Sequence, residues 1–181
     1  NTNLTIEFVR ENLYNDWDWE SLSCNAGITM KDITNHSFCP WRYELISVHP
    51  NVTIEFILQN RNKCWDWYSL SANAAITMDH VRNNRELPWE PIGLSANPNL
   101  TIAFLLEIFS PSNYFSNLVS YFQIMLYQGA TNQLYTQPEK YNWYAISKNK
   151  GITMNDVELN PKLPNGIPFP WKYGYMSYNP N

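Results

Sequence analysis

The chain is poor in charge, cysteine and glycine, and each shortage excludes a class of protein. Only 15% of its 181 residues are charged, and the net charge of −4 argues against a nucleic-acid binder, which usually presents a basic face. Cys24, Cys39 and Cys64 are too few and too scattered for a disulfide framework or a zinc site. No apolar run approaches about 18 residues, so we expect no membrane span.

The chain is rich in asparagine and aromatic residues instead. It has 24 Asn and 8 Trp, and 44% of its residues are hydrophobic, which argues against disorder. Threonine, tryptophan and serine each recur at a step of 24 residues, and such self-similarity is the mark of a repeat architecture. The repeated residues are Thr5, Thr29, Thr53, Thr77 and Thr101, then Trp17, Trp41, Trp65 and Trp89, and then Ser23, Ser47, Ser71 and Ser95.

A sixth unit follows after an insertion. Thr153 lies 52 residues after Thr101, which is one repeat plus 28 residues, and Trp171 and Ser177 follow it. Residues 179–181 repeat the Asn-Pro-Asn of residues 97–99, so we expect the chain to be part of a longer array. The predicted units are 1–24, 25–48, 49–72, 73–96, 97–148 with an insertion at about 107–138, and 149–178.

A 48-residue alternation is laid over the 24-residue period. Residues 3–24 share 12 of 22 identities with residues 51–72, but only 4 with residues 27–48. Odd units carry Phe three residues after the repeat Thr, whereas even units carry Asp or His there. Alternate units are therefore expected to occupy two different environments.

Each unit is predicted to form two short helices. The repeat threonines, with Thr153, supply N-cap oxygens, and Asn12, Asn60, Asn84 and Asn160 suit the left-handed conformation that ends many helices. The second helix is expected to begin at Pro-Trp or Asp-Trp, so that Trp17, Trp19 and Leu22 share one apolar face. Ser-x-Asn then turns the chain.

Helices of about two turns cannot stand alone, so neighbouring units must stack. We expect an all-α fold, an α-solenoid of six helix-turn-helix units with an inserted helix in unit five. A β-solenoid is the alternative, but the sequence lacks strict alternation and has only 6 Gly. The predicted repeat core is Trp17, Trp41, Trp65, Trp89, Trp143, Trp171, Leu22, Leu70 and Leu94.

Several short motifs together resemble a known group of repeat proteins. They are Asn-Pro-Asn-Leu-Thr-Ile at 97–102, Pro-Trp at 40–41, Trp-Asp-Trp at 17–19 and 65–67, and Leu-Ser-x-Asn at 22–25. In this the chain resembles the Asn/Trp-rich repeat proteins of giant DNA viruses related to mimivirus, over nearly its whole length except residues 107–138. The resemblance implies a viral, virion-associated protein, located in the virion or the host cytoplasm.

The insertion is the main candidate for partner binding. Leu118, Tyr121, Phe122, Met125 and Leu126 follow helical spacing, and insertions in repeat arrays often lie on the binding face. The alternative is that this segment packs on its own array.

Most other polar groups are expected to serve structure. The three cysteines are predicted to be buried free thiols. His36, which replaces the recurring Asn, and His49 and His80 are predicted at helix ends or on the surface. Asn3, Asn51 and Asn99, which lie in Asn-x-Thr sequons, are predicted to form part of an asparagine ladder, and the Asp of Trp-Asp-Trp is expected to face solvent.

No catalytic constellation, metal site or cofactor motif emerges, so we expect a non-catalytic scaffold. Its partners would be other proteins or further copies of the array. One alternative is a carbohydrate-binding or glycosylated surface protein, which requires exposed rings at Trp19, Trp67 and Trp143. Another is an enzyme fragment, which requires a deep pocket with convergent polar groups near the insertion.

Overall fold

The computed structural model describes residues 4–12, 14–110, 141–164, 166 and 168–180. These residues form short α-helices and no strand, apart from one isolated bridge between Lys162 and Pro168, so the all-α class is confirmed for this part of the chain. The helices are α1 Ile6–Glu11, α2 Trp19–Ser23, α3 Met30–Asn35, α4 Tyr43–Ile46, α5 Ile54–Gln59, α6 Trp67–Ala72, α7 Met78–Asn83, α8 Pro91–Ala96, α9 Ile102–Ile108, α11 Trp143–Lys148, α12 Met154–Leu159 and α13 Tyr173–Met176.

The first helix of every unit starts at its threonine. The side-chain oxygen of each of the six threonines accepts the backbone N–H three residues later, which satisfies one of the unpaired donors of the first turn. In even units the cap is reciprocal, because the side chain three residues after the threonine also accepts the backbone N–H of that threonine. The carboxylate of Asp32 accepts the backbone N–H of Thr29 at 2.8 Å, and His80 Nδ1 does the same for Thr77 at 3.3 Å.

Asparagine ends the first helix by side-chain bonding. The amide of Asn60 donates to the carbonyl of Phe56 at 2.9 Å, and Trp65 Nε1 donates to the carbonyl of Asn60 at 2.9 Å. His36 ends α3 in the same way, through Nδ1 and its own carbonyl. The predicted left-handed conformation is wrong, because Asn60 has a φ of −122° and no described residue except Gly166 has positive φ.

The second helix begins later than predicted. Trp17 lies before α2 rather than on its apolar face, because its ring is bonded back to the carbonyl of Asn12. Asp18, expected only to face solvent, is the N-cap: one carboxylate oxygen accepts the N–H groups of Glu20 and Ser21. The pKa of Asp18 lies below its usual range because its carboxylate accepts hydrogen bonds. The bond from the Ser21 hydroxyl has the largest effect, and these backbone bonds add to it.

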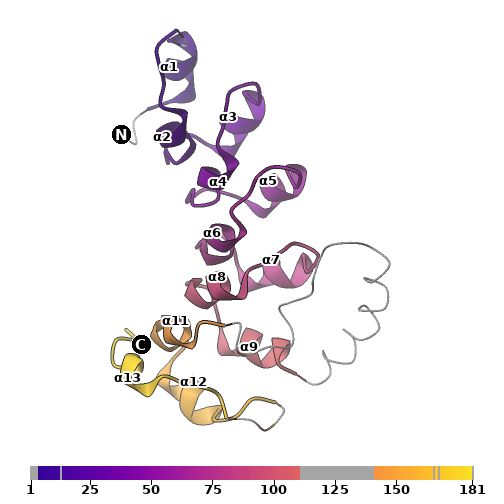
Figure 1. The fold of residues 1–181 in the computed structure, drawn as a ribbon, viewed down its shortest axis with the longest axis vertical. Helices are drawn as coiled ribbons and strands as arrows, with labels where there is room; N and C mark the ends of the chain where they lie inside the picture. Colours follow the sequence, from indigo (N-terminus) through magenta and orange to yellow (C-terminus); the bar gives the residue numbers. More distant parts are fainter. Residues whose placement is uncertain (1–3, 13, 111–140, 165, 167, 181) are drawn as a thin grey trace.

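Figure 1 shows the helices in two columns along the long axis of the molecule. The first helices of the units lie on one side and the second helices on the other, with the first unit at one end and the last unit at the other. Second helices of neighbouring units touch, as in the pairs α2 with α4, α6 with α8, α8 with α11 and α11 with α13.

A buried serine joins each unit to the next. The Oγ of Ser47 accepts the backbone N–H of Asp66 at 3.0 Å, and it also donates to the carbonyl of Tyr43 within its own helix. This serine is fully buried at every junction. The junction bonds are Arg42 to Ser23, Asp66 to Ser47, Glu90 to Ser71, Asn142 to Ser95 and Lys172 to Ser147, at 2.9–3.0 Å.

An asparagine two residues after most of these serines extends this connection. The Asn97 amide donates to the carbonyls of Ser71, Asn73 and Ile76 in the two units before it, at 2.8–3.0 Å. Its Oδ1 accepts the N–H of Asn99, and Asn99 itself donates to the carbonyl of Ala74. Asn73, Asn149 and Asn179 make the equivalent bonds to carbonyls of the two units before them. We call these serines and asparagines the Ser–Asn spine.

His49 takes the asparagine position in one junction. Nε2 lies 2.9 Å from the carbonyl of Asn25, and Nδ1 accepts the N–H of Asn51 at 3.1 Å, so the two contacts require a neutral ring protonated on Nε2. The predicted surface position for His49 is wrong, since the ring is fully buried. The sequence does not predict this burial, because His49 differs in type from the asparagines at the same position in other units. Its equivalence to them becomes evident only from its bonds at the junction.

The hydrophobic core runs through all units, and the predicted core residues lie along it. Trp41, Trp65, Trp89, Trp143, Trp171, Leu22, Leu70 and Leu94 are buried. Trp17, in the first unit, is only partly buried. Trp171 differs in another way: its Nε1 is buried with no hydrogen-bond partner among the described residues, because a six-residue insertion moves it away from Asn160.

One glycine sets the spacing of α6 and α8. A Cβ built on Gly93 would overlap the carbonyl oxygen of Tyr68 and lie 2.8 Å from the Cβ of Ser71. No side chain fits in this position, so the close approach of the two helices depends on Gly93.

Gly93→Ala is therefore expected to destabilise the protein by about 1–3 kcal/mol, because backbone must move to admit the methyl group. Gly174→Ala is the matched control. It lies in the second helix of the last unit with nothing within 4 Å of its Cβ, so it should stabilise the helix by up to about 1 kcal/mol. Urea unfolding measures both, and equal midpoints for the two variants would contradict the assignment.

His49→Ala should cost about 1–3 kcal/mol, because it removes one donor and one acceptor from the spine and leaves backbone groups unpaired. His49→Asn should recover most of that stability, since asparagine serves the same position in the other units. Thermal unfolding followed by circular dichroism tests this order. A His49→Asn protein as unstable as His49→Ala would show that the two positions are not equivalent.

Candidate interaction surface

An apolar stripe crosses three neighbouring second helices. It consists of Tyr68 on α6, Ile92 on α8 and Tyr144 on α11, each about half exposed at 51%, 49% and 50%. Each is the second residue of its helix, and the first residue packs into the array. Because consecutive helical residues point about 100° apart, the second residue faces outward. The same position holds Glu20 and Glu44 in the first two units, so the stripe is confined to later units.

Lysines and tyrosines continue this surface toward the last unit. The rings of Tyr144 and Tyr175 meet edge to face with centroids 4.8 Å apart. Lys172 Nζ lies 5.3 Å from the centre of the Tyr144 ring, and Lys148 Nζ lies 4.8 Å from that of Tyr175. These cation–π contacts hold the rings in place while leaving their outer edges in water.

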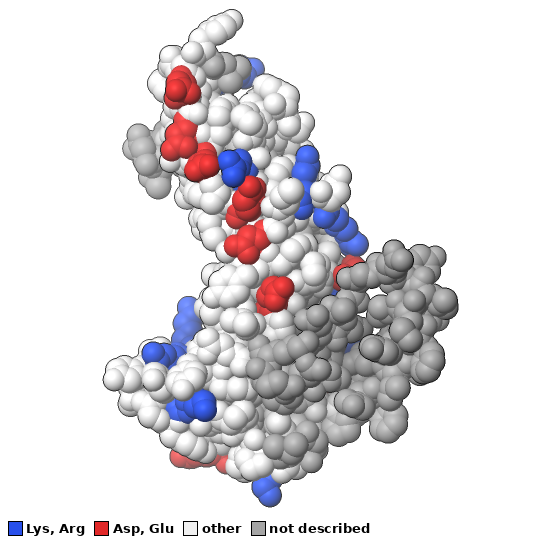
Figure 2. All heavy atoms as spheres, in the orientation of Figure 1, with Lys and Arg blue, Asp and Glu red and all other residues white. Residues whose placement is uncertain are grey.

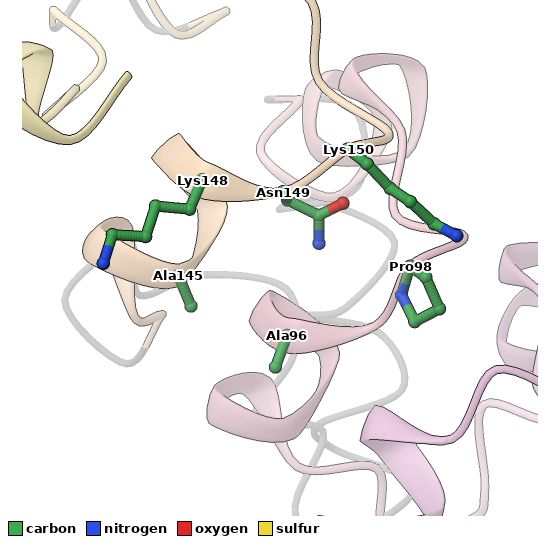
Figure 3. A pocket seen from close by; sticks show the side chains of 6 residues that line it. All are labelled: Ala96, Pro98, Ala145, Lys148, Asn149 and Lys150. Atoms are coloured by element: carbon green, nitrogen blue, oxygen red, sulfur yellow. The ribbon is translucent and has the colours of Figure 1, made fainter. Parts of the chain in front are cut away.

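A shallow hollow of about 360 Å³ lies between α8 and α11, next to the stripe. Figure 3 shows Lys148 and Lys150 extending in opposite directions from it, so the two ammonium groups do not converge. The Asn149 amide is already used in the spine, with bonds to Ser95 and Asn97. The rest of the lining is apolar, from Ala96, Pro98 and Ala145, which suits contact with an apolar side chain better than chemistry on a substrate.

Charge is distributed unevenly along the molecule. Figure 2 shows acidic side chains gathered over the first units and basic side chains at the lower left, over the last ones. Arginine–carboxylate pairs link neighbouring units in the middle, where Glu107 receives both Arg82 and Arg85. Glu107 and Asp79 raise the pKa of Arg82, and these half-exposed pairs add modest stability.

The tryptophans that a sugar-binding surface would require, Trp19, Trp67 and Trp143, do not offer open rings. Trp143 is buried, and Trp19 and Trp67 are partly buried against the core. Trp19 meets Trp41 edge to face at 5.1 Å, and Trp67 meets Trp89 in the same way at 5.6 Å. Stacking on a sugar needs an open ring face, so this arrangement disfavours the carbohydrate-binding alternative.

The cysteines differ from their prediction. Cys24, at the end of α2, and Cys64, between α5 and α6, are exposed, and only Cys39 is partly buried. Burial raises the pKa of the Cys39 thiol, and burial together with Asp18 and Glu20 raises that of Cys24. Neither thiol is activated as a nucleophile.

The predicted partner-binding residues of the insertion, Leu118, Tyr121, Phe122, Met125 and Leu126, lie outside the described residues. Of the sequon asparagines, Asn51 and Asn99 donate to carbonyls of the preceding unit, and Asn3 also lies outside the described part. The stripe was missed at the sequence level because its three residues differ in type. Their common repeat position was the available signal.

Two further properties of the described residues concern metal binding and membrane spans. Within the described ranges, no group of three or more His, Cys, Asp and Glu side chains could hold a metal ion. None of the described helices has the length and apolar character needed to cross a membrane. Comparisons with protein-family models, curated proteins and solved structures gave no match to this chain.

Proposed function

We propose that the chain is an α-solenoid of six helix-turn-helix units that acts as a non-catalytic scaffold for protein–protein interaction. The observation that carries this proposal is the Ser–Asn spine, whose bonds repeat from one unit to the next at five junctions. An array of this kind holds its exposed positions at regular spacing on a rigid support, which is how repeat proteins present extended binding surfaces.

The surface that meets the partner is the stripe of Tyr68, Ile92 and Tyr144. Aromatic and large apolar side chains are the residues that most often dominate the binding energy of protein interfaces. Lys148 and Lys172 flank the stripe, so the partner segment presents apolar side chains accompanied by carboxylates. The resemblance of the repeat motifs to giant-virus proteins supports a virion-associated structural role.

A truncation tests the solenoid organisation. In a solenoid each unit contacts only its neighbours, so removal of residues 1–48 at a unit boundary should leave the helicity per residue of the remaining chain nearly unchanged. Removal of residues 1–60, which cuts unit three after its first helix, should cost more than the loss of the residues themselves. Circular dichroism at 222 nm measures both, and complete unfolding of the 49–181 chain would exclude the solenoid.

A surface variant tests the binding role. Replacement of Tyr68, Ile92 and Tyr144 by Ser should reduce capture of protein partners from infected-cell extract at least tenfold, because it removes the apolar part of the surface. Phe38→Ser combined with Leu159→Ser is the matched control, since both residues are exposed but lie on first-helix segments. Equal loss in both variants, or none in either, would remove the stripe as the binding surface.

A further inference from the structure

Lys172 and Arg42 occupy the same repeat position but have different neighbours. Each follows the repeat Trp and directly precedes a four-residue helix, α13 or α4. Arg42 is paired with Glu20 of the unit before it at 3.0 Å and with Glu44 of its own unit at 3.1 Å. A cation in this position is thus held between two carboxylates.

Neither carboxylate is present around Lys172. Tyr144 has the repeat position of Glu20, and Gly174 has that of Glu44. Lys172 Nζ lies over the Tyr144 ring, 5.3 Å from its centre, and no described atom lies within 4 Å of a Cβ built on Gly174. None of the ion pairs among the described residues involves Lys172. The cation is therefore in place, with open space where the second unit has a carboxylate.

A second lysine is held by the same group of rings. Lys148 Nζ lies 4.8 Å from the centre of the Tyr175 ring and 5.3 Å from that of Tyr178. The Tyr175 ring meets Tyr144 edge to face, so the rings of α11 and α13 connect the two lysines. In the described part of the chain Lys148 takes part in no ion pair either. We call Lys148, Lys172, Tyr144, Tyr175 and Tyr178 the lysine–tyrosine cluster.

This cluster lies on the side of the array rather than on an end face. Lys148 is exposed although α13 packs against its helix α11. Val48 has the repeat position of Tyr178 and is 54% exposed, although the third unit follows it directly. Arg42, at the position of Lys172, keeps a side chain that is 47% exposed in the same surroundings. These positions stay accessible whether or not a further unit packs on α13.

Carboxylates are the ligands that suit these two lysines. A lysine ammonium has three N–H donors, and contact with a ring face leaves donors for an anion. Around Arg42, the equivalent surroundings hold carboxylates at hydrogen-bond distance. The stripe ends at Tyr144, whose ring Lys172 covers, so a ligand of the cluster also touches the apolar surface.

The opposite end of the second-helix column disfavours an acidic ligand. Glu20 and Glu44 hold the positions that Tyr68, Ile92 and Tyr144 hold further along. Figure 1 shows the second helices along the inner side of a curve, and concave surfaces of this kind are those that repeat proteins use for extended binding. A segment on this surface therefore has its apolar side chains over α6, α8 and α11, and its carboxylates over α11 and α13.

We propose that the partner contributes an extended acidic peptide segment, whose carboxylates bind Lys148 and Lys172 and whose apolar side chains lie on the stripe. This inference rests on the proposed function, because it names the conformation and the orientation of the segment that the stripe binds. Packed helices are about 8–10 Å apart and an extended chain rises about 3.3 Å per residue, so the segment advances about three residues per unit. Its apolar residues recur at that step, and its carboxylates follow at the same step.

Fluorescence anisotropy of labelled synthetic peptides with the purified 181-residue chain tests the proposal. The probe peptide has Leu at every third position for three steps and Glu at the next two steps, with Ser and Gly between them. A second probe has the reverse order, so that both chain directions are covered. We expect one of the two to bind about tenfold or more tightly than its own version with Gln in place of Glu, and the difference to shrink at high salt.

Gly174→Glu gives the sharpest result. It supplies a carboxylate at the position of Glu44, beside Lys172, so it should weaken binding of the Glu peptide about tenfold more than Gly174→Gln does. Lys172→Gln should weaken the Glu peptide about threefold or more and leave the Gln peptide unchanged. Lys63→Gln is the matched control and should alter neither, since Lys63 also lies over a tyrosine ring, 5.2 Å from the centre of Tyr43, but between α5 and α6.

Three results would overturn the proposal. They are equal binding of the Glu and Gln peptides, equal effects of Gly174→Glu and Gly174→Gln, and no binding of either probe. Circular dichroism shows that each variant keeps its helicity before binding is compared. Capture by the stripe variant judges the proposed function separately, so reduced capture together with equal binding of the Glu and Gln peptides rejects only the carboxylate site.

Discussion

The rest of the structure depends on one hydrogen bond, the bond from a backbone N–H of one unit to a buried serine hydroxyl of the unit before it. The donor is the residue just after the repeat Trp, where the chain enters its second helix and has no helical partner of its own. The serine is fully buried, so this bond cannot be exchanged for water. Each of these bonds thus orients the start of one second helix against the second helix before it, and helices too short to fold alone are held together.

The same bond explains why a long insertion is tolerated. Ser95 accepts the N–H of Asn142, 47 residues away, with the same length as the junctions that span 19 residues. Tyr141 and Asn142 occupy the same repeat positions as Trp89 and Glu90, so the spine bond does not depend on how many residues separate its two partners. The shorter insertion before Trp171 preserves the spine bond of Lys172 but not the Trp bond, so Trp171 Nε1 has no hydrogen-bond partner among the described residues. The spine bond is therefore kept at a junction where the Trp bond is lost.

The repeat period, the helix caps and most of the buried positions could be read from the sequence, because each recurs at a fixed step. What the sequence did not predict are interactions whose partners lie one unit away. From the sequence Asn97 is a turn residue, and its three bonds to the two units before it are evident only in the structure, as is its equivalence to His49. The role of Gly93 could not be predicted for the same reason, since it depends on the close approach of a carbonyl of α6. Local propensity predicts the helices, but the roles of these residues depend on how neighbouring helices pack against each other.

The units differ from one another at positions that the spine leaves free. The second residue of the second helix is Glu20, Glu44, Tyr68, Ile92, Tyr144 and Gly174 from the first unit to the last. Because the serine three positions later accepts the same bond at each of the five junctions, these side chains can change from acidic to aromatic while the junction bond is kept. An acidic beginning and an aromatic, lysine-bearing end give the molecule a direction along its axis.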